Sequence, residues 1–356
     1  MRIAIVAAAR FPIREPFTGG LEAHAWSLAR GLRAHGHRVS VFAGPGSDPA
    51  FDIQELTLRP WTVSATARAD VSMTPDWWLE EHHAYLSLML DLAGADYDVV
   101  HNNSLHYLPI AMAATLPMPV VTTLHTPPTP WLESAIRAPA SCDVTFAAVS
   151  QFTAAAWADV VPDVDVRVVM NGVDLDHWRP GSGGHSAIWS GRIVPEKGPH
   201  LAVHAARRAG IPLRIAGPIL DMAYFRQQIQ PLLAGDDITY VGHLTSDELV
   251  GLVGASAVSI VTPDWDEPYG LVVAESFACG TPVAAIGRGA IPELIDHGSG
   301  RVAPPGNTEA LAAAIRSAST LDRNTVRRRA VEHCSIDAML TNYEGLYDQL
   351  TARPAA

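Results

Sequence analysis

Short apolar strands alternate with helical segments along almost the whole chain, and this alternation restricts the possible folds more than any other feature. In the first half, runs rich in β-branched residues lie at residues 2–9, 39–43, 99–101, 120–125 and 144–150. Helical patterns at residues 21–35 and 77–93 lie between them. Short apolar strands separated by helices predict parallel βαβ units, with helices covering both faces of a sheet.

The same alternation begins again after residue 186. Further apolar runs lie at residues 187–190, 213–216, 238–241, 258–261 and 283–286. Residues 179–186 (RPGSGGHS) are rich in Gly and Ser, which is typical of a linker. A chain of 356 residues is long enough for two α/β domains. We therefore expect two Rossmann-like, doubly wound domains, residues 1–178 and 187–335, that face a central cleft.

The C-terminal segment, residues 336–352, has the pattern of an amphipathic helix. Its apolar residues recur at helical spacing, on one face: Met339, Leu340, Tyr343, Leu346, Tyr347 and Leu350. Such a face must pack against another part of the protein. We expect this helix to complete the N-terminal domain.

Charge and hydropathy exclude several classes of function. The formal net charge of −12 disfavours a nucleic-acid partner, whose phosphates would be repelled. It also disfavours a strongly basic membrane-docking face, although a local peripheral contact stays open. No run of 18 apolar residues occurs, so no transmembrane segment is predicted. The apolar run at the N-terminus has only about seven residues and no cleavage-like site, so we interpret it as a first buried strand.

The cysteines point to a reducing compartment. Cys142, Cys279 and Cys334 are far apart and form no CxxC pair. A disulfide framework or a zinc site is therefore not expected. Together with the missing membrane span, this predicts a cytoplasmic protein.

The segment with the most chemical content is residues 263–282, PDWDEPYGLVVAESFACGTP. A predicted strand precedes it, and Gly270 marks the start of a helix at about residues 271–279. Free backbone N–H groups at such a helix start can bind a phosphate or sugar oxygen. Glu267 lies in the loop and Glu275 in the second helical turn. Glu275 is either a solvated helix carboxylate or, because its neighbours are apolar, a buried one that needs ligand hydroxyls as partners.

This segment resembles the signature of glycosyltransferase family 4, whose members are retaining enzymes with the two-domain GT-B architecture. The resemblance rests on Glu267 and Glu275, separated by seven residues within EPYGLVVAESFACGTPVAA. It implies that Glu267 hydrogen-bonds the hydroxyls of the donor sugar and that Glu275 binds the ribose of the nucleotide. It also places Tyr269 and the amides of Gly270 and Leu271 against the sugar and the diphosphate.

A second motif, SGRIVPEKG at residues 190–198, lies between another predicted strand and helix. Arg192 and Lys197 are two cations on one loop, and two fixed cations can neutralise a leaving diphosphate without a metal. The alternative is two surface cations at a helix start, where positive charge is unfavourable. Family 4 has a matching Gly-Arg…Glu-Lys-Gly pattern with the first role, so both residues are predicted to be catalytic and to bind the donor.

Glycines precede the first predicted helix in TGGLEAH, residues 18–24. Gly19 and Gly20 allow a close approach of the backbone to a ligand, and a purely structural turn is the alternative. In the family, a glycine pair at this place faces the donor phosphates and the acceptor. The motif is not the GxGxxG fingerprint of dinucleotide binding, so the sequence gives little support to a dehydrogenase function.

Polar residues follow two predicted strands of the first half. His125 ends one of them, and the family has a histidine here near the donor sugar, so we count it among the catalytic residues. Asn102, Asn103 and His106 follow the other strand and are the candidates for the acceptor pocket. Ser150 and the Asn-Gly-Val-Asp sequence at residues 171–174 resemble family elements near the hinge.

Pairs of aspartates with one residue between them hold a divalent metal in many sugar transferases of another fold. Such triplets occur here at residues 96–98, 163–165, 174–176 and 264–266. In a chain this acidic several arise by chance, and no coordination geometry follows from them. The pair Arg192 and Lys197 makes a metal unnecessary, so neither a metal nor a cofactor is predicted.

The resemblance implies front-face transfer of a sugar from a nucleotide diphosphate, with UDP or GDP expected, to a hydroxyl group. It also implies that the domain of residues 1–178 lies on the acceptor side and the domain of residues 187–335 on the nucleotide-sugar donor side. The acceptor is a sugar, a natural product or a lipid-linked glycan. Charge stabilisation and positioning supply the catalysis, and no protein nucleophile is needed. Two alternatives stay open: a nucleotide-sugar epimerase or sugar phosphorylase on a similar scaffold, and a silent nucleotide-binding subunit. The intact Arg192, Lys197, Glu267 and Glu275 speak against the silent subunit.

Overall fold

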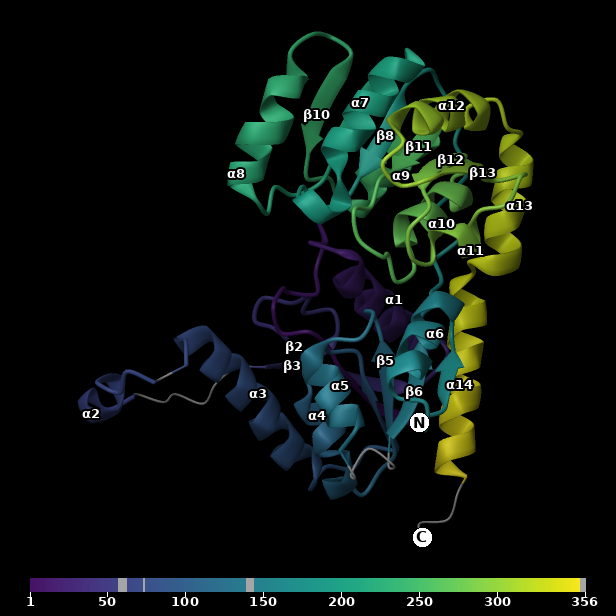
Figure 1. The fold of residues 1–356 in the computed structure, drawn as a ribbon. Helices are drawn as coiled ribbons and strands as arrows, with labels where there is room; N and C mark the ends of the chain where they lie inside the picture. Colours follow the sequence, from purple (N-terminus) through teal and green to yellow (C-terminus); the bar gives the residue numbers. More distant parts are fainter. Residues whose placement is uncertain (57–62, 73, 139–143, 353–356) are drawn as a thin grey trace.

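The computed structural model describes residues 1–56, 63–72, 74–138 and 144–352. These residues form two parallel β-sheets (Figure 1). The seven-stranded sheet has the order β3-β2-β1-β4-β5-β6-β7, and the six-stranded sheet has the order β10-β9-β8-β11-β12-β13. We call residues 1–168 with 336–351 the N-terminal lobe and residues 187–333 the C-terminal lobe. The predicted pair of Rossmann-like, doubly wound sheets is confirmed.

The strands of the first sheet are β1 (Arg2–Val6), β2 (Arg38–Ala43), β3 (Asp52–Glu55), β4 (Val99–Asn102), β5 (Val120–Leu124), β6 (Val144–Ala148) and β7 (Val166–Val168). Those of the second are β8 (Ala187–Ser190), β9 (Leu213–Ala216), β10 (Ile238–Gly242), β11 (Val258–Val261), β12 (Val283–Ile286) and β13 (Gly300–Ala303). The sequence pattern missed β3, β7 and β13. All three are edge strands. One side of an edge strand meets solvent, so it lacks the continuous apolar run of a central strand.

The helices before the linker are α1 (Gly20–Ala34), α2 (Ala65–Arg68), α3 (Asp76–Leu92), α4 (Leu108–Ala111), α5 (Pro130–Ile136) and α6 (Gln151–Val160). Those after it are α7 (Pro199–Ala209), α8 (Met222–Tyr224), α9 (Ser246–Gly254), α10 (Leu271–Ala278), α11 (Ile291–Leu294), α12 (Thr308–Ala318), α13 (Arg323–His333) and α14 (Ile336–Thr351). Among the described helices, none has the length and apolar content needed to cross a bilayer.

Each sheet is covered on both faces by an apolar core. In β1, Ile3 and Ile5 belong to a cluster with α1 and α14, whereas Ala4 and Val6 belong to the cluster under α3 to α6. This alternation follows from the two-residue period of a strand. β1 ends at Val6, three residues before the end of the predicted run. The next residues leave the sheet, and several of them line the cleft described below.

Helix α14 runs from the C-terminal lobe back along the N-terminal lobe (Figure 1). Its Leu340 packs so closely on Gly31 of α1 that a Cβ at Gly31 would lie 2.4 Å from Leu340 Cδ1. Tyr343 shares a 2.9 Å hydrogen bond with Thr123 of β5. We propose that this helix completes a first domain of residues 1–178. The thiols of Cys279 and Cys334 are buried and free, and Cys142 lies outside the described residues.

Candidate active site

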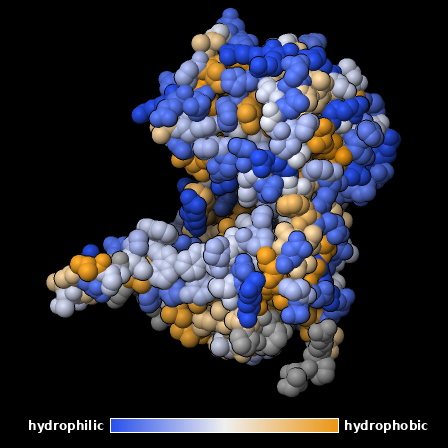
Figure 2. Space-filling view, in the orientation of Figure 1, coloured by the Kyte–Doolittle hydropathy of each residue, from blue (hydrophilic) through white to orange (hydrophobic). Residues whose placement is uncertain are grey.

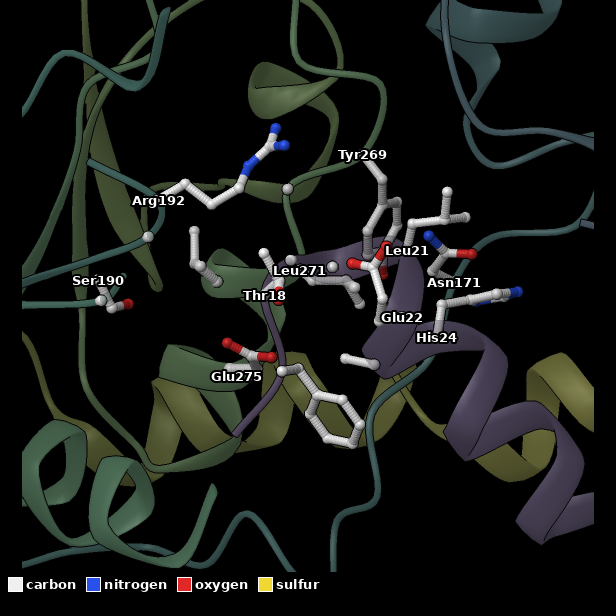
Figure 3. A pocket seen from close by; sticks show the side chains of 18 of the residues that line it. Thr18, Leu21, Glu22, His24, Asn171, Ser190, Arg192, Tyr269, Leu271 and Glu275 are labelled. Atoms are coloured by element: carbon white, nitrogen blue, oxygen red, sulfur yellow. The ribbon is translucent and has the colours of Figure 1, made fainter. Parts of the chain in front are cut away.

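A cavity of about 430 Å³ lies between the two lobes, at the carboxyl ends of both sheets. Figure 2 shows the surface hollowed there. Ten residues predicted from the sequence line this cleft: Gly19, Gly20, His125, Arg192, Lys197, Glu267, Tyr269, Gly270, Leu271 and Glu275. Figure 3 shows several of them converging from α1, the loop after β8 and the start of α10. Segments far apart in the sequence thus meet in one site.

Lys197 and Glu267 form a fixed ion pair in the cleft. Lys197 Nζ lies 2.7 Å from Glu267 Oε2, and Trp265 Nε1 donates a 3.0 Å hydrogen bond to the same oxygen. The ammonium also lies 4.9 Å from the centre of the Trp265 ring, a cation–π contact. The other oxygen, Oε1, receives no hydrogen bond from a described residue. The carboxylate is therefore held in place with one oxygen available to a ligand hydroxyl.

The loop that carries Lys197 depends on Gly198. This glycine has φ of +59°, and a Cβ there would lie 2.3 Å from the carbonyl oxygen of Thr262. Any other residue would push apart the loop after β8 and the end of β11. The close backbone packing brings Lys197 next to the loop that contains Glu267.

Arg192 presents a cationic side chain to the cleft. Its guanidinium forms no hydrogen bond or ion pair with a described residue, and it lines the cleft. Its stem lies beside the start of α1, where a Cβ at Gly19 would lie 3.7 Å from Arg192 Cδ. A Cβ at Gly20 would lie 3.1 Å from Leu271 Cδ1. The glycine pair therefore allows α1 to approach the C-terminal lobe closely, next to a guanidinium that can bind a phosphate.

The start of α10 offers backbone donors to the cleft. Gly270 caps this helix in the left-handed region, at φ of +100°, and a Cβ there would lie 2.7 Å from Ile291 Cδ1. The N–H groups of Gly270 and Leu271 donate to no described acceptor in the structure. Such N–H groups, at the positive end of a helix dipole, suit an anionic or strongly polar ligand.

Glu275 is a partly buried carboxyl group one turn further along α10. No described residue donates a hydrogen bond to its carboxylate. Burial raises its pKa to about 7, because desolvation disfavours the charged form. This corresponds to the buried-carboxylate interpretation of the sequence, in which ligand hydroxyls supply the missing partners.

The pKa of Glu275 predicts how stability depends on pH. Because its pKa in the folded state lies above the ordinary value of 4.5, the free energy of unfolding should fall as pH rises from about 4.5 through about 7. Glu275→Gln removes the titrating group, so this decrease should be smaller in the variant. Urea denaturation of both proteins at pH 5 and pH 8, without nucleotide, measures the difference. Parallel pH profiles would contradict the assignment.

The cleft also contains buried polar groups to which the sequence analysis gave no ligand-binding role. His24 is only 3% exposed, and neither of its ring nitrogens has a hydrogen-bond partner. Burial lowers its pKa to about 4, against a smaller opposite effect of the nearby Asn103 side chain, so the ring is neutral at pH 7. Asn171 Oδ1 is likewise buried without a partner. Buried polar atoms without partners are rare in proteins and mark a place where a ligand or water binds.

Glu22 also lines the cleft and stands in the first turn of α1. It is buried, which raises the pKa of its carboxyl, while the charges of Arg192 and Arg10 act in the opposite direction. A local signal for Glu22 and His24 did exist in the sequence. Both follow the glycine pair at a helix start, in a turn where the other side chains are apolar.

His125 is positioned by a residue that was predicted for another role. Its Nε2 lies 3.0 Å from Asn103 Oδ1, and its ring packs edge-on against His24 with centres 4.8 Å apart. Burial, with the nearby His24 and His101, lowers the pKa of His125 well below its ordinary value. A neutral His125 therefore faces the cleft as a hydrogen-bonding group rather than as a cation.

Asn102, Asn103 and His106, predicted for the acceptor pocket, do not line the cleft itself, and their role toward an acceptor stays a prediction. Asn102 Oδ1 accepts hydrogen bonds from the backbone N–H of Ser104 (3.0 Å) and from its hydroxyl (2.7 Å). These bonds shape the turn after β4.

The aspartate triplets do not assemble a metal site in the described parts of the chain, where no group of three or more His, Cys, Asp or Glu residues has suitable geometry. Asp96 and Asp98 both pair with Arg2 on the first sheet. Asp264 pairs with Arg288 at 3.2 Å.

The start of α6 joins the N-terminal lobe to the loop that contains Glu267. Ser150 Oγ donates a 2.6 Å hydrogen bond to the carbonyl oxygen of Pro268, and Thr153 Oγ1 donates to the same oxygen at 3.1 Å. The carboxylate of Glu293, from α11, accepts a 3.1 Å hydrogen bond from the backbone N–H of Gln151. These contacts between the lobes hold the residue next to Glu267 in a defined position.

Two family models match the chain, and the boundary between them lies between the two β-sheets. The profile described as Glycosyltransferase Family 4 matches residues 18–177, and that described as Glycosyl transferases group 1 matches residues 180–333. Glycogen synthase of Mycobacterium tuberculosis is 28% identical over 374 residues, which cover 93% of this chain and 88% of that protein. MMP alpha-(1->4)-mannosyltransferase of Mycolicibacterium hassiacum is 25% identical, with 95% and 96% covered.

Among solved structures, Anabaena Alr3699/HepE in complex with UDP and glucose has a TM-score of 0.75 to this chain. The two share 19% sequence identity, and the match covers 98% of this chain and 100% of that one. At this identity the likeness concerns the fold, which is the same arrangement of two facing lobes.

Proposed function

The chain belongs to glycosyltransferase family 4, with the GT-B architecture, and we propose that it transfers a hexosyl group from a nucleotide-diphosphate sugar to a hydroxyl acceptor with retention of configuration. The observation that carries this proposal is the meeting of Arg192, Lys197, Glu267 and Glu275 in one cleft. Two cations suit a diphosphate, and two carboxylates suit the hydroxyls on either side of it.

In the proposed donor complex, the diphosphate lies between Arg192 and Lys197, close to the amides at the start of α10. The free oxygen of Glu267 accepts a hydrogen bond from a sugar hydroxyl, and Glu275 accepts from the ribose. The complex of HepE with UDP and glucose supports a UDP-sugar as the donor, and a GDP-sugar is the second candidate. Neutral His125 faces the sugar from the N-terminal lobe.

The proposed reaction is a front-face displacement. The bond between the anomeric carbon and the diphosphate oxygen breaks, and the acceptor hydroxyl forms the new bond on the same face. The departing phosphate takes the acceptor proton. Arg192 and Lys197 stabilise the charge that develops on the phosphate, which is the largest contribution that fixed groups make to such a reaction. No protein nucleophile takes part.

The test is a screen of nucleotide sugars with the purified protein, read by mass spectrometry as slow hydrolysis and then as transfer to added acceptors. Hydrolysis of one UDP- or GDP-sugar, followed by formation of an α-linked product from an α-linked donor, is the expected result. Phosphate-dependent cleavage, or conversion of the donor sugar without any acceptor, would instead assign an epimerase or a phosphorylase. Nucleotide binding without turnover of any donor would assign a silent subunit.

Metal independence is part of the proposal, because Arg192 and Lys197 take the place of a divalent ion at the diphosphate. Transfer should continue at an undiminished rate in excess EDTA. Assays with and without the chelator, on protein dialysed beforehand, measure this. Loss of activity that Mn²⁺ or Mg²⁺ restores would contradict the proposal, and the aspartate triplets would then be the candidate metal ligands.

A further inference from the structure

A cluster of aromatic rings from three different elements lies on the N-terminal lobe and takes no part in the donor site. It consists of Trp78, His82 and Tyr85 of α3, His106 and Tyr107 before α4, and Trp131 of α5. The ring centres of its neighbours lie 4.5–6.2 Å apart. We call these six residues the aromatic cluster. The three helices lie side by side in Figure 1.

The cluster is buried at its base and open at its top. Tyr85 is fully buried, and its hydroxyl donates to the carbonyl oxygen of Ala7 at 2.8 Å. Trp78 and Tyr107 are partly exposed, and Trp131 is 53% exposed. Tyr107 and Trp131 stack almost in parallel, with 19° between their planes. Grouped aromatic rings that face solvent mark a surface for a ligand or partner more often than a part of the core.

The cluster is continuous with the cleft through three segments. Leu105 lines the cleft and directly precedes His106. Thr126 lines the cleft five residues before Trp131, so an extended chain between them spans at most about 18 Å. Arg10, also on the cleft wall, interacts electrostatically with Glu81 of α3. The exposed rings therefore begin next to the part of the cleft that the N-terminal lobe lines.

The charges and polar atoms around the aromatic cluster indicate which kind of ligand it can bind. Over residues 76–92, α3 has the carboxylates Asp76, Glu80, Glu81 and Asp91 and no Lys or Arg. This charge disfavours an anionic lipid surface and a phosphorylated ligand. Polar ring atoms accompany the apolar faces, as in Tyr107, whose hydroxyl lies 3.3 Å from His82 Nδ1. Flat apolar faces with polar edges match pyranose rings, which have apolar C–H faces and hydroxyls at their rims.

We propose that the aromatic cluster is an extended acceptor subsite for a neutral oligosaccharide. The sugar unit that receives the transferred hexose lies in the cleft, and the next units stack on the exposed rings of Trp78, Tyr107 and Trp131. The proposal deepens the proposed glycosyltransferase function and rests on it. It assigns the acceptor to the class of neutral glycans longer than one unit.

Direct binding without any donor tests this subsite. The full-length protein is titrated with malto-oligosaccharides and with α-manno-oligosaccharides of one to six units, by calorimetry and tryptophan fluorescence. In at least one series, affinity should rise about 10-fold or more between one unit and four. Trp131→Ala should abolish this gain and leave the affinity for one unit unchanged. Trp77→Ala is the matched control, because Trp77 is an exposed tryptophan of α3, next to Trp78 in the sequence, and lies outside the cluster.

The proposal would be overturned if affinity did not rise with glycan length in either series, or if Trp131→Ala and Trp77→Ala changed glycan affinity equally. It would also be overturned if the protein bound phosphatidylcholine–phosphatidylglycerol vesicles through Trp131 and bound no glycan. Circular dichroism checks that the variants fold, which exposed side chains should permit. A donor-hydrolysis assay separates the failure of the subsite from the failure of the proposed transferase activity. Turnover of a nucleotide sugar without length-dependent glycan binding contradicts only the subsite, whereas glycan binding without any donor turnover contradicts the proposed function.

Discussion

Arg192→Ala is expected to lower kcat at saturating donor by about 10²–10³-fold, the usual effect of removing one fixed donor that stabilises charge in a transition state. Its guanidinium lines the cleft and forms no hydrogen bond or ion pair with a described residue, and Glu22 is the buried carboxyl group whose pKa its charge lowers. The guanidinium N–H groups are therefore available to a leaving diphosphate. Arg192→Lys should recover only part of the loss, because a lysine keeps the charge but lacks the planar fork that binds two phosphate oxygens. Steady-state kinetics with saturating donor and acceptor measure both variants.

The matched control is Arg214→Ala, since Arg214 is an exposed cation on β9 away from the cleft. It should keep wild-type kcat. If Arg192→Ala also turned over at the wild-type rate, Arg192 would have no part in leaving-group stabilisation. Lys197 is a less direct probe, because its removal also leaves Glu267 without its 2.7 Å partner.

The second large effect should separate the two glutamates. Glu275→Ala is expected to weaken the binding of free nucleotide diphosphate by about 10–100-fold, because charged hydrogen bonds contribute roughly 1.5–3 kcal/mol. Glu267→Gln should leave that affinity nearly unchanged while transfer falls by at least about 10²-fold. The reason is positional. Five helical residues from Gly270 to Glu275 span about 7–8 Å, which is comparable to the reach from a sugar across the phosphates to a ribose.

Calorimetry with the free nucleotide and transfer assays with the full donor measure the two effects independently. Asp266→Asn is the control for loop charge, because Asp266 is exposed in the same loop and does not line the cleft. It should change neither quantity strongly. Equal loss of nucleotide affinity in Glu267→Gln and Glu275→Ala, or loss in neither, would contradict this division of roles. The isosteric change at Glu267 keeps the shape of the side chain next to Lys197 and Trp265.

The sequence alone predicted the two sheets and ten of the residues that line the cleft, because both depend on local signals. Central strands in parallel sheets are buried on both faces and therefore appear as continuous apolar runs. The carboxyl ends of such strands meet at one edge, so motifs placed just after them are brought together by the topology. Arg192 after β8 and Glu267 after β11 are examples, since β8 and β11 pair directly.

Tertiary structure decided which groups these side chains meet. Lys197 and Glu267 are 70 residues apart, and nothing in either motif predicts their ion pair or the indole N–H of Trp265 that completes it. Asn103 was correctly placed at a strand end, yet it is buried behind His125 and orients that ring. The aromatic cluster likewise gathers rings from three segments. Hydrogen bonds and ring contacts act over a few ångströms in space, so they are determined by packing across the fold rather than by the order of residues along the chain.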